Sequence, residues 1–314
     1  VKELVDWKVR RGGPHVSFTA DETLKNIKEV DARCRVEGEQ TFVETVKRLD
    51  SGESNPFKGV QGLSYRKGDG IVHEPNRPLM EDLDSIPWPA LDLLEMDKYS
   101  IVVHHTDTRA INMMTSRGCP QGCNYCSTSF FWGRRTRFRD LTDVVDEIEM
   151  LLGKYTWAKG IYFFDDTFTI SPKRTIQFCE MVKKRGLDFE WTCEARANTI
   201  NEELVRSMKG AGCKFVCVGV ESGSQKVLDT INKGITIEQV VKTKDLLEKY
   251  SINKKFFFMM SLPSETPEDV RQTLRFSNRM NPEEKLLSVA RIYPGTQFET
   301  LAKQEGVIPK DFSW

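Results

Sequence analysis

Three cysteines, Cys119, Cys123 and Cys126, lie within a stretch of eight residues in this chain of 314 residues. Gly118, Gly122 and the proline between them keep the stretch out of a helix and let its backbone wrap closely around a bound group. The apolar run just before it is typical of a short buried strand. Thiols in a loop that leaves the end of a strand indicate a metal site.

The number of cysteines helps to distinguish a zinc site from an iron–sulfur cluster. Structural zinc takes four ligands, and simple iron–sulfur clusters take four cysteines. The next cysteine, Cys179, falls on an expected helix. A four-iron cluster held by three cysteines keeps one iron open, as catalytic zinc keeps an open position. The other interpretations are a zinc knuckle completed by a distant Cys or His, and three unrelated thiols; the tight spacing and the glycines favour the cluster.

The spacing Cys-x3-Cys-x2-Cys, with Tyr125 before the last cysteine, resembles the signature of the radical S-adenosylmethionine (SAM) superfamily. The resemblance implies that Cys119, Cys123 and Cys126 hold a [4Fe–4S] cluster, whose open iron binds the amino and carboxylate groups of SAM. It also implies Tyr125 as a cofactor contact, and an external one-electron reductant of the flavodoxin or ferredoxin type.

The amino-acid composition limits the binding partners and the cellular location that we expect for this chain. The chain has 46 basic and 46 acidic residues, so its net charge gives no electrostatic case for nucleic acid. The longest apolar run, residues 256–260, is far shorter than a transmembrane span, and no signal peptide is visible. Clustered thiols without a secretory signal predict a reducing, cytoplasmic location. Because the chain starts at Val1 and stops without a terminating element, we expect both ends to be truncated.

From about residue 107 the sequence alternates between strand and helix patterns. Six such pairs predict parallel units with right-handed crossovers, and therefore an α/β fold, a partial (βα)6 barrel with six of the eight units of a complete one. Ligands of such folds sit at the carboxyl ends of the strands. Strands are expected at residues 112–116, 160–164, 189–194, 214–221, 254–261 and 286–292, and helices at 142–152, 172–184, 201–209, 237–249 and 267–279.

The N-terminal residues predict the end of a doubly wound, Rossmann-like sheet. Strands are expected at residues 5–9 and 30–36 and a helix at 41–49. The pair Gly12-Gly13 after a strand is, by itself, more typical of a tight turn. With Glu37-Gly-Glu39 it resembles the end of the cobalamin-binding domain of cobalamin-dependent (class B) radical SAM enzymes. The resemblance implies that Gly12 and Gly13 lie along the nucleotide tail of cobalamin; the earlier Asp-x-His-x-x-Gly motif of that family is absent.

These patterns divide the chain into four parts. Residues 1–60 are expected to be the C-terminal part of a cobalamin-binding domain, and residues 61–106 a hairpin and a proline-rich linker. We expect Trp88, Leu91, Leu93 and Leu94 to pack the linker onto the next domain. Residues 107–305 are expected to form the radical SAM barrel, and residues 306–314 to begin a C-terminal extension.

Polar residues follow the second to fourth of the expected barrel strands. Asp165 and Asp166 are expected to meet a cation, and the resemblance implies the ammonium group of SAM; a helix cap is the other interpretation of Asp166. Arg196 suits a cofactor carboxylate or a structural salt bridge equally well. Glu221 can accept hydrogen bonds from ribose hydroxyls, and the resemblance assigns Glu221 and Ser222 to that role.

The last two strand ends resemble the adenine side of the family site. Ser261 and Ser264 stand where glycines are usual, and we expect strain if their backbones are left-handed. The resemblance places Ser261 and Ile292 against the cofactor.

The resemblance implies an enzyme that makes a 5′-deoxyadenosyl radical and, with cobalamin, methylates an unactivated carbon of a small-molecule or lipid substrate. One alternative is a cobalamin-linked radical cyclase or rearrangement enzyme. Another is a methylthiotransferase, which needs three further N-terminal cysteines where only Cys34 is present. The third is a non-catalytic zinc or iron–sulfur binding protein.

Overall fold

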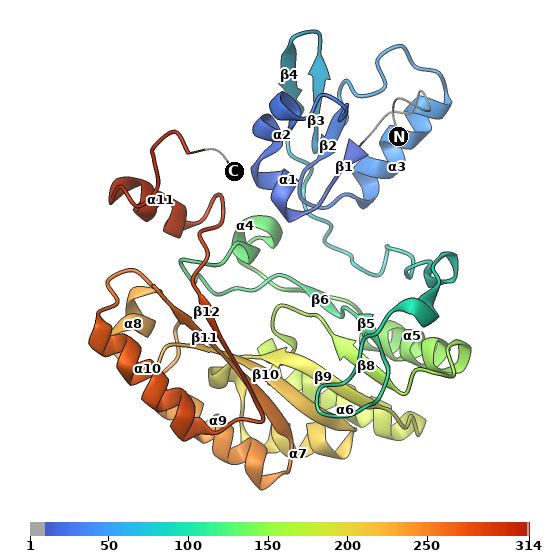
Figure 1. Ribbon diagram of the computed structural model, residues 1–314. Coiled ribbons are helices and arrows are strands. Elements are labelled where there is room, and N and C mark those ends of the chain that lie inside the picture. The colour runs from blue at the N-terminus through green and yellow to red at the C-terminus, as the bar shows by residue number, and fades with distance from the viewer. Residues whose placement is uncertain (1–9, 313) are drawn as a thin grey trace. The chain divides into compact units, whose positions relative to one another are not determined.

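The computed structural model describes residues 10–312 and Trp314 (Figure 1). The strand predicted at residues 5–9 lies outside the described residues. The chain divides into two compact units. The N-terminal unit holds the described residues up to Glu81 together with residues 126–132 and 292–314, and the core unit holds residues 82–125 and 133–291.

The core unit is built on a six-stranded parallel sheet, in the order β12-β11-β10-β9-β8-β5. Every strand and helix predicted for this region overlaps an observed one, so the alternating α/β pattern is confirmed. The strands are β5 (Ala110–Met113), β8 (Gly160–Phe163), β9 (Glu190–Ala195), β10 (Cys213–Glu221), β11 (Asn253–Met260) and β12 (Glu284–Val289). The helices between them are α5 (Leu141–Lys154), α6 (Pro172–Arg185), α7 (Glu202–Gly210), α9 (Ile237–Lys249) and α10 (Pro267–Met280).

Helices α6, α7, α9 and α10 lie along one face of this sheet (Figure 1). The core between the sheet and the helices is aromatic: the Trp191 and Phe178 rings lie 5.9 Å apart, and Phe163 packs edge-on against both. Helix α10 begins as its sequence predicts, because Thr266 and Asp269 form a capping box around Pro267.

Several short elements of the chain were not predicted. They are too short for a hydrophobic period to be recognised. They are β6 (Ser116–Arg117), β7 (Arg137–Phe138), α4 (Thr128–Trp132), α8 (Gln225–Thr230), α11 (Gln297–Gln304) and the 3₁₀ turns η1 (Leu91–Leu93), η2 (Met96–Lys98), η3 (Phe168–Ile170) and η4 (Ala197–Thr199).

The N-terminal unit has a four-stranded sheet in the order β1-β2-β3-β4. The pair β1–β2 is parallel, and the pairs β2–β3 and β3–β4 are antiparallel. The predicted hairpin is therefore present, but it extends this sheet instead of standing beside it. The elements are β1 (Arg10–Arg11), α1 (Pro14–Phe18), α2 (Ala20–Asn26), β2 (Ala32–Cys34), α3 (Glu39–Asp50), β3 (Leu63–Lys67) and β4 (Gly70–His73).

The proline-rich segment, itself part of the core unit, is held to α5 by Trp88, whose Nε1 donates to Asp143 over 3.0 Å. The expectation that Leu93 also packs there is wrong, because its side chain is 81% exposed, and Leu94 is exposed as well. No helix among the described residues is long and apolar enough to cross a membrane.

Candidate functional site

The cysteine loop, residues 118–126, follows β5 of the six-stranded sheet and the short strand β6, which pairs with β7 in a separate two-stranded sheet. Gly118 has a φ of 96°, a conformation that favours glycine. Its amide donates to Oδ2 of Asp166 over 3.0 Å, and its carbonyl accepts from Thr136 Oγ1 over 3.1 Å. The start of the loop is therefore tied to the end of β8.

A second segment, residues 230–234 after α8, holds the middle of the loop; we call it the clamp segment. The backbone amide of Asn124 donates to Ile231 O over 3.0 Å, and its side-chain amide donates to Thr230 O over 2.9 Å. Asn232 Nδ2 donates to Gly122 O over 2.8 Å. A Cβ on Gly122 would lie 3.2 Å from that nitrogen, so the close approach favours glycine. The sequence gives no sign of this clamp, because its partners lie about 110 residues apart.

Lys233 of the clamp segment joins two residues predicted separately as cofactor contacts. Its Nζ lies 2.6 Å from Glu221 Oε1 and 3.2 Å from the Tyr125 hydroxyl, which itself donates to Glu221 Oε1 over 3.0 Å. Lys233 and Glu221 are both buried. A Cβ on Gly219 would lie 2.7 Å from Glu221 Oε1, so the network needs a glycine there. Sequence reasoning missed Lys233, which reads locally as a turn residue.

Arg196 lies beside the second cysteine. Its NH1 is 3.7 Å from Cys123 Sγ, its NH2 donates to Lys233 O, and its Nε donates to Asn198 Oδ1 over 3.4 Å. The side chain is buried. The guanidinium therefore places positive charge beside this cysteine sulfur.

The two aspartates after β8 have different surroundings. Asp165 is fully buried and accepts hydrogen bonds from Thr115 N and Oγ1, at 3.1 and 2.8 Å, and from Ser116 Oγ. Burial raises the pKa of Asp165, although these donors oppose the rise. Asp165 thus accepts hydrogen bonds from hydroxyl and amide donors, and its contact with the ammonium group of SAM stays a prediction. Asp166 is only partly buried and accepts from Gly118.

Ser222, like Asp165, is hydrogen-bonded to other groups of the protein. It is fully buried; its Oγ lies 3.0 Å from Thr273 Oγ1 and accepts from Ser224 N over 3.1 Å. A Cβ on Gly223 would lie 2.6 Å from Phe276 Cβ. Ser222 thus packs the end of β10 against α10, and its assignment to ribose stays a prediction that this burial does not favour.

The other predicted contacts are spread over both units. Ser261 is exposed with a φ of 65°, and Ser264 has a φ of 60°, as expected for positions where glycine is usual. Ile292 is partly buried in the N-terminal unit. Gly12 and Gly13 precede α1, and Gly13 has a φ of 103°.

The donor set suits an iron–sulfur cluster. The loop offers three thiols, separated by Pro-Gln-Gly and by Asn-Tyr, and Arg196 places positive charge beside one of them. Over residues 10–312 and Trp314, no three side chains of Cys, His, Asp or Glu are already grouped to hold a metal ion. The assignment of Cys119, Cys123 and Cys126 as ligands of one cluster therefore stays a prediction.

Comparison with known sequences gives several relatives that are similar over most of this chain, among them the following two. It is 39% identical over 287 residues to an uncharacterized methyltransferase of Pyrococcus horikoshii, an alignment that covers 91% of this chain and 61% of the relative. It is 35% identical over 279 residues to the anaerobic magnesium-protoporphyrin IX monomethyl ester cyclase of Rubrivivax gelatinosus, covering 87% of this chain and 49% of the relative. The chain thus spans about half to three fifths of these relatives.

Among solved structures, the fold is similar to that of the radical SAM methyltransferase TsrM from Kitasatospora setae, determined with cobalamin and a [4Fe–4S] cluster bound. The TM-score is 0.78 at 20% identity, over 97% of this chain and 59% of TsrM. The sequence profile of the radical SAM superfamily matches residues 113–277, more than half of the chain. Membership implies a [4Fe–4S] cluster and SAM as cofactors, and the chain belongs to the radical SAM superfamily.

Proposed function

We propose that this protein is a cobalamin-dependent radical SAM methyltransferase that acts on an unactivated carbon. The observation that carries the radical SAM part is the cysteine loop, which is held at the strand ends with Arg196 and Glu221 beside it. The similarity to a methyltransferase, and the fold shared with a cobalamin-bound one, support methyl transfer. Gly12 and Gly13 are proposed to lie along cobalamin.

Cys119, Cys123 and Cys126 would hold the cluster, which supplies, when bound, the electron for reductive cleavage of SAM. Arg196 keeps positive charge next to the Cys123 sulfur. Tyr125 and Lys233 both engage Oε1 of Glu221, which fixes the orientation of this carboxylate for the ribose hydroxyls. The role of the protein is therefore to orient SAM and the reacting carbon and to exclude water.

The test uses the full chain, purified anaerobically, reconstituted with iron and sulfide, and reduced in the presence of SAM labelled in its methyl group. We expect 5′-deoxyadenosine, and label transferred to added cobalamin. Cys123→Ala should lose both iron and product. Cys179→Ala, at a buried helix position outside the loop, should keep both. A protein that retains iron but makes no 5′-deoxyadenosine would be a non-catalytic iron–sulfur protein instead.

A cobalamin-linked radical cyclase is the second candidate, because the Rubrivivax relative at 35% identity is a cyclase. The same experiment separates the two functions. A cyclase would form 5′-deoxyadenosine while the labelled methyl group stays in methionine, with or without cobalamin.

A further inference from the structure

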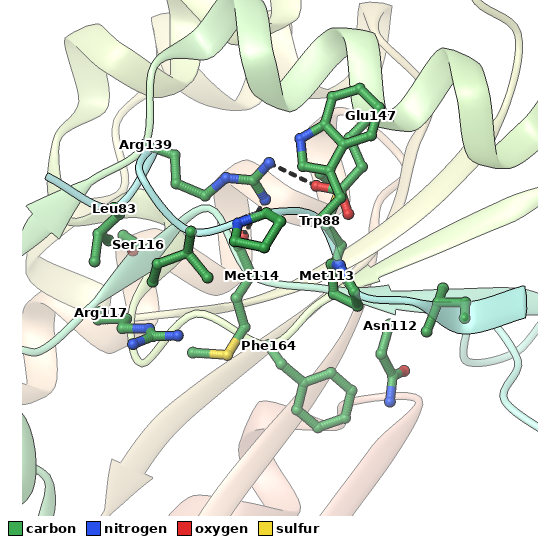
Figure 2. A pocket seen from close by; sticks show the side chains of 14 residues that line it. Leu83, Trp88, Asn112, Met113, Met114, Ser116, Arg117, Arg139, Glu147 and Phe164 are labelled. Carbon is green, nitrogen blue, oxygen red and sulfur yellow. Dashed lines mark hydrogen bonds and ion pairs between the residues drawn. The ribbon is translucent and has the colours of Figure 1, made fainter. Parts of the chain in front are cut away.

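A cavity of about 450 Å³ lies in the core unit, beside the strand that leads to the cysteine loop (Figure 2). One wall comes from the proline-rich segment, including Leu83, Trp88 and Leu91, and another from β5 and the residues after it. Figure 2 shows the ring of Trp88 next to Glu147 of α5. We call this cavity the linker pocket. Its volume is within the usual range for small-molecule sites.

Three charged side chains line the linker pocket: Arg139 and Glu147, which pair with each other, and Arg117. The NH2 of Arg139 lies 2.6 Å from a carboxylate oxygen of Asp143 and 2.6 Å from one of Glu147, and its NH1 donates to Met114 O over 3.0 Å. The remaining lining is mainly leucine, isoleucine, proline, methionine, tryptophan and phenylalanine. The pocket therefore suits an apolar group better than a charged one.

The linker pocket is also preorganised. Trp88 is fixed by its hydrogen bond to Asp143, and the prolines on both sides of it limit the backbone of the segment. Leu83 and Met113 are buried beneath it. A wall that is fixed before binding loses little conformational freedom when a ligand enters.

The linker pocket is lined by residues that adjoin the cysteine loop and Asp165 in sequence. Ser116 and Arg117, which line it, directly precede Gly118, and Phe164 directly precedes Asp165. Phe164 is 47% exposed and Met114 is exposed as well. Exposed apolar side chains at the edge of a cavity indicate a recognition surface.

Resting on the function proposed above, we infer that the linker pocket binds the hydrocarbon part of the substrate, an aliphatic chain or the apolar edge of a ring. The reacting carbon then lies on the side of Phe164, toward the cysteine loop. This inference defines the substrate as a molecule with a substantial uncharged apolar portion.

The probe for this inference is Nile red, an uncharged apolar dye, titrated into the full chain. Phe164→Gln at the mouth and Leu91→Gln in the wall are each expected to weaken binding at least fivefold. Leu286→Gln on β12 is the matched control, because Leu286 is also 47% exposed and lies outside the pocket; it should bind the dye as the unchanged protein does. Equal affinity in all variants, or no binding to the full chain, would overturn the inference.

Two competitors identify the kind of apolar group. Displacement of the dye by decan-1-ol indicates a chain, displacement by naphthalene indicates a ring, and displacement by neither would contradict the site. Formation of 5′-deoxyadenosine by the unchanged protein is measured in the same preparation. Its absence would overturn the proposed function while leaving the dye titration to decide the pocket.

Discussion

Lys233 and Glu221 form an ion pair whose side chains are only 6% and 9% exposed. Removing one member of a buried pair leaves the other charge uncompensated, which costs about 3–5 kcal/mol. We therefore expect Lys233→Met to lower the free energy of unfolding by about 3 kcal/mol, measured by urea denaturation.

The control for this change is an exposed pair of the same kind. Lys98 and Glu95 lie 2.7 Å apart with both side chains mostly in solvent. Lys98→Met should change stability by about 0.5 kcal/mol or less. If the two variants lost similar amounts of unfolding free energy, burial of the Lys233–Glu221 pair would not contribute to stability.

Glu194 of β9 makes the free energy of unfolding depend on pH. Burial raises its pKa from 4.5 to about 7, against the hydrogen bond that it accepts from the Tyr162 hydroxyl over 2.9 Å. The folded state therefore binds this proton more tightly than the unfolded state does. The resulting stability is fully present below pH 4.5 and is lost as pH rises through about 7.

Glu194→Gln keeps the shape of the side chain and removes the proton equilibrium. We expect the melting temperature of the variant, relative to that of the unchanged protein, to rise between pH 5 and pH 8. Glu180→Gln, at an exposed position of α6, should show no such trend. A constant difference across this range would contradict the assignment of the titration to Glu194.

Single residues also show where sequence reasoning stops. Cys119, Cys123 and Cys126 are recognisable because their spacing is local. Asp165 and Ser222 have the residue types that ligand contacts need, yet both are fully buried and bonded to distant hydroxyls of Thr115 and Thr273. No local pattern in the sequence predicts these hydrogen bonds, because their partners are far away in the chain.

At the scale of elements, the clamp segment sets the geometry of the cysteine loop. Asn232 has a φ of 52°, and its Nδ2 donates to Gly122 O. Asn232→Asp places an acceptor opposite that carbonyl, so we expect faster amide hydrogen exchange in residues 119–125 and lower iron retention. Asn232→Gly suits the backbone conformation but removes the bond, and should give a smaller effect. Unchanged exchange in the Asp variant would show that the loop does not depend on the clamp.

The loop after β11 stores backbone strain at Ser261 and Ser264, both with positive φ. A residue other than glycine in this region costs roughly 1–2 kcal/mol. Ser264→Gly should therefore raise the denaturation midpoint modestly. Ser207→Gly, inside helix α7, should lower it, since glycine destabilises a helix interior by about 0.5–1 kcal/mol. A shift of the denaturation midpoint in the same direction in both variants would exclude backbone strain as the cause.

The long elements of the core unit were predictable because their apolar residues recur at a regular spacing over many positions. Residue types that favour a helix start also mark some of their ends, as at Thr266. The strand at residues 30–36 is shorter than predicted, and Val36 has a φ of 61°. The pairing of the hairpin with β2 was not predictable, since alternation specifies a strand but not its neighbour.

Across the whole molecule, the eight cysteines fall into two groups. Cys119 and Cys126 are partly exposed, and the other six are buried. Burial raises the pKa of the Cys179, Cys193 and Cys217 thiols, which suppresses their reactive thiolates. In the metal-free protein, iodoacetamide should label Cys119 and Cys126 first, as read by peptide mass spectrometry.

Reconstitution with iron and sulfide should then protect these two cysteines. Cys179, Cys193 and Cys217, which are buried outside the cysteine loop, serve as internal controls, since they should stay unlabelled with and without metal. Labelling of Cys119 and Cys126 at the same rate after reconstitution would contradict their role as cluster ligands.

The N-terminal unit is made of segments that are far apart in the chain, and the sequence did not predict that they belong together. Residues 126–132 and 292–314 belong to it, although they are far from residues 10–81 in the chain. The contacts are specific: the Phe18 and Phe130 rings lie 6.3 Å apart, and a Cβ on Gly295 would lie 3.1 Å from Phe18. Such contacts join segments whose local patterns are unrelated.

The sheet of the core unit ends at β12, which has a neighbouring strand of that sheet on only one side. Leu286 and Val289 on this strand are exposed, and Lys285 next to Leu286 is the nearest exposed charge. An open strand edge with apolar side chains is a template for intermolecular β-pairing, which a lysine discourages. Pairing of β12 with a strand of another molecule is therefore one expected route of aggregation at high protein concentration, and we expect Lys285 to oppose it.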